Sequence, residues 1–134
     1  MSIKLESVCV LLQVFDMQTS MQFYRGVLGF ALVSRWPPEG QHVDWALLRL
    51  GGAELMLNTA FDSEERPSAP DAARTAAHAD TTLYFACQDV DHVYRHLRSH
   101  ELDVKPPQVA PYGMKQVYVS DPDGYQLCFQ WPAA

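Results

Sequence analysis

Alternating and helical runs of hydrophobic residues divide the first half of the chain into strands and one helix. Residues 7–15 alternate apolar side chains with a mixed set, which predicts a strand with one wholly apolar face. From Met17 the apolar positions take helical spacing until Gly29, so we expect an amphipathic helix of about three turns. The remaining alternating runs predict strands at 30–36, 43–50 and 53–58.

The second half repeats this order of elements. Residues 82–88 alternate as a strand, and a helix is expected over 89–100. A short run at 104–109 contains prolines, which places it at a sheet edge. Residues 116–131 surround an Asp-Pro-Asp-Gly turn, in which Pro presets φ and Gly accepts a positive φ. They therefore predict a closing β-hairpin.

The repeat predicts the fold. When one half is slid onto the other, Asp16 falls on Asp89 at the same strand-to-helix corner, which indicates two βαβββ modules. We expect an α+β fold in which the two modules form a cupped mixed sheet with the helices on its outer face. The connection is rich in Ala and Pro, with a short helical turn expected near 72–77. The predicted boundaries are about 7–58 for the first module, 59–80 for the linker and 82–131 for the second module.

The strand faces that the helices leave uncovered are the candidate site. If the helices cover the wholly apolar faces, the opposite faces line a shared concavity that mixes apolar surface with few polar groups, which is typical of a small-molecule pocket. The alternative is a face that is partly washed by solvent and merely polar. Strand parity gives the predicted ligand-binding residues: Cys9, Gln13, Trp45, Arg49, Glu54, Met56, Asn58, Thr82, Tyr84, Gln126, Cys128 and Gln130.

A few side chains in the sequence could carry chemistry. Glu54 is the carboxylate predicted to point inward from a strand, where it would be paired, metal-bound or protonated, unless it lies at an exposed strand edge. Cys9 and Cys128 are either small buried hydrophobes or ligands. No Gly-rich phosphate loop or nucleophile elbow is present, and no catalytic residue is predicted. Three histidines recur every four residues on the second helix, and a solvated helix face explains their spacing better than a metal site: His92, His96 and His100.

Composition narrows the class of partner. The formal charge is −6 over 134 residues and the basic residues are scattered, which argues against a nucleic-acid partner and favours cationic ligands. Three cysteines without paired spacing do not indicate a disulfide framework. No basic leader and no apolar run of membrane-spanning length precede or interrupt the pattern, so we expect a cytoplasmic protein without a membrane partner.

Four motifs resemble the vicinal oxygen chelate superfamily, which comprises glyoxalases, bleomycin-resistance proteins and extradiol dioxygenases. Residues 16–30 are similar to its D-x-x-x-S-x-x-FY-x-x-x-LGF opening helix. Residues 51–57, 89–91 and 121–125 match the rest of the pattern in the same order. The resemblance covers nearly the whole chain and is specific for the fold. It is less specific for activity, because one fold hosts many chemistries.

The resemblance implies where a metal would sit in the enzymes of the family. Their four ligands, two His and two Glu, fall on Cys9, Glu54, Thr82 and Cys128, so that only Glu54 is retained. Thr is a poor ligand, and a Glu with two thiolates does not suit the metals that His and carboxylate hold. The resemblance therefore predicts no metal and no other cofactor. A zinc site of three ligands, made by both cysteines and Glu54, is the alternative.

The same resemblance points to the metal-free branch typified by bleomycin-resistance proteins. It implies a small organic ligand, an antibiotic or other toxic compound, and a homodimer in which the linker is long enough for modules to be exchanged. A metal-dependent lyase, isomerase or dioxygenase with a non-standard site around Glu54 is the alternative function. A third interpretation, an interaction module without a ligand, would show no thermal shift with any compound.

Overall fold

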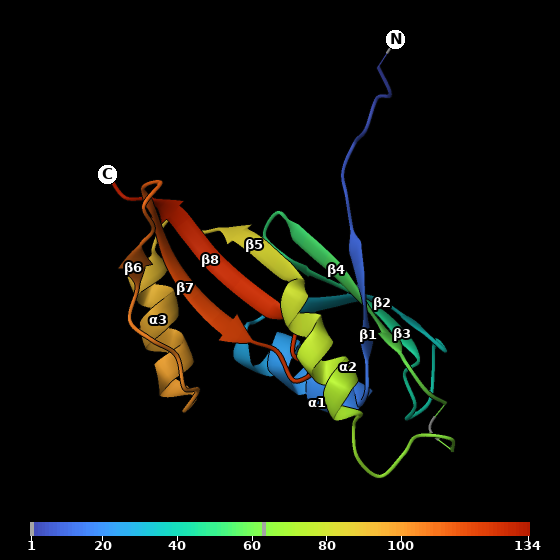
Figure 1. The fold of residues 1–134 in the computed structure, drawn as a ribbon. Helices are drawn as coiled ribbons and strands as arrows, with labels where there is room; N and C mark the ends of the chain where they lie inside the picture. Colours follow the sequence, from blue (N-terminus) through green and yellow to red (C-terminus); the bar gives the residue numbers. More distant parts are fainter. Residues whose placement is uncertain (1, 63) are drawn as a thin grey trace. The chain divides into compact units, whose positions relative to one another are not determined.

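A computed structural model gives the fold of residues 2–62 and 64–134 (Figure 1). The chain divides into two compact units, residues 1–68 and residues 69–134, and each is described by itself. Each unit contains helical segments and one four-stranded mixed sheet, which confirms the predicted α+β class. Among the described residues, no helix has the length and apolar character needed to cross a membrane.

Unit 1 is a mixed sheet with a helical segment between its first two strands. β1 runs parallel to β4, β4 is antiparallel to β3, and β3 is antiparallel to β2, so the strand order is β1-β4-β3-β2. Two glycines close the β3–β4 hairpin as predicted. The elements are β1 (Val10–Val14), α1 (Met17–Met21), the π-helix η1 (Gln22–Val27), β2 (Ala31–Trp36), β3 (Trp45–Leu50) and β4 (Ala53–Thr59).

Unit 2 repeats this topology after a short helix. Its strand order is β5-β8-β7-β6, with β5 parallel to β8 and the other neighbours antiparallel. The predicted edge strand is β6, which is only two residues long. The elements are α2 (Ala72–Ala77), the 3₁₀-helix η2 (His78–Asp80), β5 (Thr82–Ala86), α3 (Val90–Ser99), β6 (Gln108–Val109), β7 (Met114–Ser120) and β8 (Gln126–Pro132).

One face of each sheet is closed by helical residues. In unit 1 the side chains of Leu12, Leu48 and Leu55 are fully buried or nearly so, and they lie on the face to which helical Phe23 and Tyr24 also contribute buried rings. In unit 2, α3 packs against β7 and β8 (Figure 1). The buried residues of that face are Val90, Leu97, Val117, Val119, Leu127 and Phe129.

Asp16 and Asp89 occupy equivalent places, as the repeat predicts. Asp16 is the N-cap of α1, where its Oδ1 accepts hydrogen bonds from the backbone N–H groups of Gln18 and Thr19. Asp89 is the N-cap of α3, and its Oδ1 accepts from the backbone N–H of His92 at 2.9 Å. In both modules the carboxylate satisfies backbone donors that the first helical turn leaves without partners.

The first strand is shorter than predicted. Pairing with β4 begins at Val10, which lies opposite Leu55, and the hairpin that supplies β4 begins only at Ala53. The chain before Val10 therefore extends beyond its partner strand, as Figure 1 shows, and Val8 is 90% exposed. Cys9 accordingly precedes the strand on which parity placed it.

The first helix is also not regular. Five residues of α-helix are followed by the π-helix η1, and the backbone N–H of Leu28 donates to the carbonyl of Phe23 at 3.0 Å. The wider turn brings both Phe23 and Tyr24 into the core, and their rings meet edge to face with centroids 5.1 Å apart. Helical spacing predicts one apolar stripe through Met17, Met21, Tyr24 and Leu28. Met17 and Tyr24 are buried, whereas Met21 and Leu28 are only half-buried, because the π-turn rotates the helix surface.

The end of the connection is part of unit 2. The helix predicted near 72–77 is α2, and it continues into η2, where the His78 ring stacks on Tyr125 with centroids 4.1 Å apart. His78 Nδ1 donates to the carbonyl oxygen of Asp123 at 2.7 Å. Within the turn, Asp121 Oδ1 accepts from two backbone N–H groups at 2.9 Å each. Connection and turn thus pack together inside unit 2.

Candidate functional site

The four-stranded sheet of unit 2 packs one face against its core. The opposite face is lined by uncharged polar groups, and we call it open face 2. Register places Thr82, Gln126 and Ser120 in one row across the sheet. Tyr84, Cys128 and Tyr118 form the next row. The third row holds Ala86, Gln130 and Gln116. Every member of the second unit's predicted ligand-binding set, which is Thr82, Tyr84, Gln126, Cys128 and Gln130, therefore lies on this one face.

Amide side chains cross-link the outer rows of open face 2. Gln116 Nε2 donates to Gln130 Oε1 at 2.8 Å, and also to the Tyr112 hydroxyl at 2.9 Å. In the other outer row, Gln126 Nε2 donates to Ser120 Oγ at 2.7 Å. These bonds hold the amide groups over the sheet, where a ligand would meet their remaining donors and acceptors.

Two tyrosines and a cysteine form the middle row. Tyr84 is 54% exposed and Tyr118 43% exposed, whereas Cys128 between them is fully buried. A hydrogen bond with Tyr84, burial and a hydrogen bond with Cys128 raise the pKa of the Tyr118 phenol well above its ordinary value. Burial also raises the pKa of the Cys128 thiol, which the hydrogen bond from Tyr118 partly offsets. Tyr118 and Cys128 are therefore neutral near pH 7.

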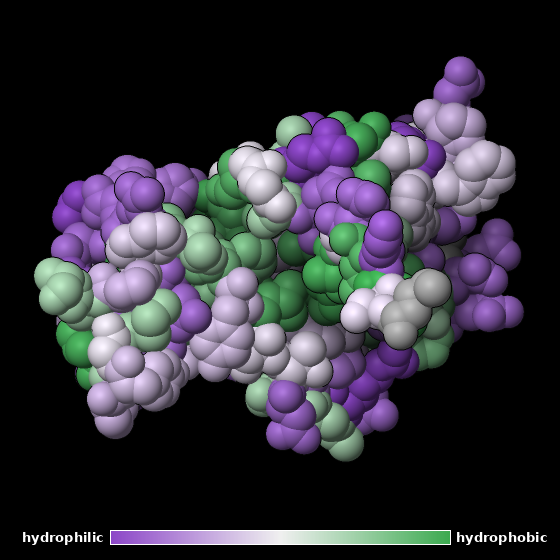
Figure 2. Space-filling model, turned by 90° about the horizontal axis from the view of Figure 1, so that it is seen from above, coloured by the Kyte–Doolittle hydropathy of each residue, from purple (hydrophilic) through white to green (hydrophobic). Residues whose placement is uncertain are grey.

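The corresponding face of sheet 1, open face 1, combines apolar and amide side chains. Gln13, Asn58 and Trp45 form a row, in which Asn58 Nδ2 donates to Gln13 Oε1 at 3.2 Å. The next row crosses the sheet through Leu11 and Met56. Large apolar side chains are exposed in both units. Figure 2 shows one face of the molecule, on which hydrophobic and hydrophilic residues are mixed.

The third row of open face 1 holds an ion pair. Arg49 and Glu54 lie opposite each other in the β3–β4 hairpin, and Arg49 donates from Nε and Nη2 to Glu54 Oε2 at 2.9 and 2.7 Å. The side chain of Glu54 is 29% exposed and that of Arg49 52%. Glu54 is therefore half-buried and paired, rather than deeply inward-pointing. Burial, and next the carboxylate of Glu54, raise the pKa of the Cys9 thiol.

A groove of about 610 Å³ reaches open face 2 from the sheet edge. The short strand β6 covers only the Lys115–Gln116 part of β7, which leaves the rest of this edge accessible. Several open-face residues line the groove, and Val104 is buried against it while Lys105 stands at its exposed rim. The shared residues are Gln116, Tyr118, Ser120 and Gln126.

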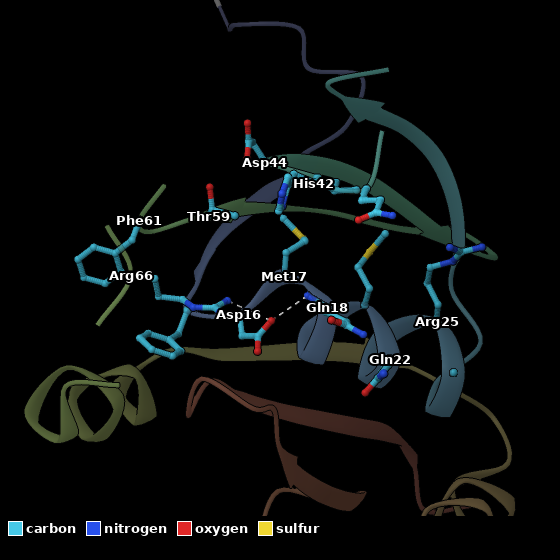
Figure 3. Close-up of a pocket in the computed structure, with 15 residues that line it drawn as sticks. Asp16, Met17, Gln18, Gln22, Arg25, His42, Asp44, Thr59, Phe61 and Arg66 are labelled. Atoms are coloured by element: carbon cyan, nitrogen blue, oxygen red, sulfur yellow. Dashed lines mark hydrogen bonds and ion pairs between the residues drawn. The ribbon is translucent and has the colours of Figure 1, made fainter. Parts of the chain in front are cut away.

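A second groove, of about 570 Å³, lies at the start of α1 in unit 1 (Figure 3). Arg66 pairs with Asp16 at 3.4 Å and stands over the ring of Phe15, 5.5 Å from its centroid. His42 and Arg25 also line the groove (Figure 3). Sequence reasoning missed this groove, because it depends on a contact between residues fifty positions apart in the chain, and only the motif residue Asp16 was a signal.

The sequence comparison decides the family. The sequence pattern described as the Glyoxalase/Bleomycin resistance protein/Dioxygenase superfamily matches residues 7–129. The chain belongs to this superfamily. One relative in sequence is the uncharacterized protein YaeR of Escherichia coli (strain K12), which is 32% identical to this chain over 114 residues, or 84% of each chain. The resemblance stated from the motifs is therefore confirmed.

Several solved structures share the fold. The structure of TioX from Micromonospora sp. ML1 superposes with a TM-score of 0.72 at 23% identity, covering 93% of this chain and 97% of that one. TnmS3 from Streptomyces sp. CB03234, described as an antibiotic-binding protein, superposes with a TM-score of 0.69 at 24% identity, covering 98% and 99%. At these identities the likeness establishes the fold alone.

The residues at the superfamily's metal positions do not fit a divalent metal. Thr82 carries a neutral hydroxyl, which is a poor ligand, and Cys9 and Cys128 carry soft thiols where the enzymes of the superfamily are expected to carry His and carboxylate. Glu54 Oε2 already accepts two hydrogen bonds from Arg49. Within neither unit, over residues 2–62 and 64–134, do three His, Cys, Asp or Glu side chains gather as a metal cluster. Among these described residues, His92, His96 and His100 of α3 do not form such a cluster either.

The burial of Cys128 predicts unequal thiol reactivity. In native protein, a disulfide reagent should titrate Cys9 and Cys87, which are partly exposed, and leave Cys128 reacting at least about a hundredfold more slowly. Cys128→Ala should remove the slow thiol, and equal rates for all three would contradict the structure.

The same two cysteines predict a pH dependence of stability. Because folding raises the pKa values of Cys9 and Cys128, the free energy of unfolding should be constant below the ordinary thiol pKa and fall as pH rises above it.

Proposed function

We propose that this protein binds a small organic compound, an antibiotic or another toxic molecule, without using a metal. The observation that carries the proposal is that the superfamily's metal positions hold Thr82, two cysteines in place of His and Glu, and a Glu54 paired with Arg49. The name of TnmS3, an antibiotic-binding protein with the same fold, supports the choice of ligand. A homodimer in the cytoplasm belongs to the same proposal.

Open face 2 and the groove beside it are the proposed binding surface in unit 2. Exposed aromatic rings supply most of the contact energy in small-molecule sites, and Tyr84 and Tyr118 are such rings. A groove of about 610 Å³ is large enough for a compound of drug size. Trp45, beside Gln13 and Asn58, gives open face 1 the same combination of ring and amide.

Elemental analysis and a compound screen test this proposal together. Untagged protein should contain much less than one equivalent of any transition metal per chain, and compounds that raise its melting temperature should do so equally in the presence of a chelator. Tyr84→Ala should weaken binding to open face 2, and Trp45→Ala binding to open face 1, each about tenfold or more, since aromatic contacts dominate such sites. Trp131→Ala, which removes a ring from the other face of β8, is the matched control.

Two results would favour a metal-dependent enzyme over the proposed metal-free binding protein. One equivalent of a transition metal that is lost in Glu54→Ala protein, or turnover that a chelator abolishes, would show a metal-dependent site. A broad screen in which no compound changes the melting temperature would leave an interaction module as the better account.

A further inference from the structure

The net negative charge of the protein does not come from the strands that form its candidate binding faces. Of the 16 carboxylates in the chain, Glu54 is the one placed in a strand over residues 2–62 and 64–134, and it is neutralised by Arg49. The other basic side chains in strands have partners elsewhere. Arg35 donates to the carbonyl oxygens of the loop that follows β2, and Lys115 pairs with Asp91 of α3 at 2.6 Å.

Open face 2 contains no acidic or basic side chain among its nine residues. Its polar groups are amides, hydroxyls and the protonated thiol of Cys128, and its rings are those of Tyr84 and Tyr118. The groove beside it carries one carboxylate, Asp103, and one ammonium, Lys105, both exposed at the rim and of opposite sign. A ligand on this face therefore meets no net charge.

A charged ligand would lose its hydration on such a face without gaining a counter-charge. Transfer of an unpaired ion from water into a polar but uncharged protein surface is unfavourable, whereas amides and phenols replace the hydration of carbonyl and hydroxyl groups well. The rings of Tyr84 and Tyr118 offer flat apolar surface on which an aromatic ring system stacks. Open face 2 should therefore bind uncharged ligands more tightly than charged ones.

We infer that the ligand is an uncharged, flat aromatic compound that carries carbonyl or ether oxygens, held by the neutral rows of open face 2. The inference rests on the proposed function and names the chemical class that the site accepts. It differs from the cationic ligand that the total charge of −6 suggested, because among the described residues every carboxylate except Glu54 lies outside the strands.

Matched compounds that differ only in charge test the inference. The probes are methoxyflavone, the same skeleton with a carboxymethyl group and the same skeleton with an aminomethyl group, repeated on two further three-ring aromatic ketones. Calorimetry should show the neutral member of a series binding about tenfold more tightly than either charged member. Its Kd should change less than about twofold between roughly 0.05 and 0.5 M salt, since no charge pair is screened.

Placing one charge on open face 2 should reverse the preference. Gln130→Glu keeps the size of the side chain and the acceptor for Gln116, and it should strengthen binding of the aminomethyl compound about tenfold while making that binding salt-dependent. Gln88→Glu adds the same charge at an exposed position after β5 and should leave all affinities unchanged. Melting temperatures establish that both variants are folded.

Each outcome separates this inference from the proposed function. Tightest binding of a charged member, a strongly salt-dependent Kd for the neutral member, or binding by no member of the three series would overturn the ligand class. In those cases the wider compound screen and the elemental analysis still decide whether the protein binds small molecules without metal. A bound metal would instead overturn the proposed function, whatever the order of the affinities.

Discussion

Replacing Gly124 by alanine is expected to lower the free energy of unfolding by about 3 kcal/mol or more, which is a large part of the stability of a small domain. Gly124 closes the β7–β8 turn with φ of +91°, a conformation that side chains other than glycine adopt with strain. An added Cβ would also overlap the carbonyl oxygen of Thr75 and lie 3.1 Å from its carbonyl carbon. Urea unfolding followed by circular dichroism measures the loss.

Gly113→Ala is the matched control for this prediction. Gly113 has the same φ of +91°, but nothing lies within 4 Å of the Cβ it would acquire. Its substitution should cost about 1 kcal/mol from backbone strain alone. The difference between the two variants therefore measures the contact between the turn and α2, and equal losses would show that α2 is not packed on Gly124.

Replacing Cys128 by glutamate, the residue that the superfamily's enzymes place there, is expected to destabilise the protein by about 3 to 5 kcal/mol at neutral pH. Cys128 is fully buried beneath Tyr84 and Tyr118, and no cation faces it on open face 2. A carboxylate at this position would be buried without a metal or a basic partner. Urea unfolding at pH 7 measures the loss.

The pH dependence distinguishes this effect from a mere misfit of size. Burial should raise the pKa of the new carboxyl, so that the folded state holds a proton more tightly than the unfolded chain. The penalty should therefore be small below about pH 4, where both states are protonated, and grow as pH rises above the ordinary Glu pKa of about 4.3. Gln130→Glu, two residues along the same strand and half-buried, should cost about 1 kcal/mol or less. A pH-independent loss at Cys128 would contradict the argument.

The sequence of elements along the chain and the facing of their side chains were predictable, because both follow from local periodicity. The period of two in each strand placed Trp45, Glu54 and Met56 on one face, and the register of the sheet agrees. Asp16 and Asp89 were correctly aligned because an N-cap satisfies backbone donors within its own first turn. The number of residues paired in β1 was not predictable, since it depends on where β4 begins.

Contacts that set the chemistry of the candidate site were harder to predict, since they depend on pairs of side chains. Arg49 and Glu54 were both expected on the same face, and counting outward from the two glycines of the hairpin would have placed them opposite each other. Tyr118 was absent from the expected set, although counting outward from the second hairpin turn puts it beside Cys128. The π-helix η1 has no signature in the hydrophobic pattern, and whether the expected residues bind a ligand stays a prediction.

The contacts at the two ends of the connection shorten the part of it that is not anchored. Arg66 is held by Asp16 and Phe15 in unit 1, and Asp71 caps α2 in unit 2, where its Oδ1 accepts from the backbone N–H of Ala73 at 2.9 Å. What remains between these anchors is Pro-Ser-Ala-Pro, and the proline rings fix φ at both of its ends. Four residues with two fixed φ angles have fewer backbone conformations than four unrestricted residues, so this segment has less conformational entropy to lose if it becomes ordered.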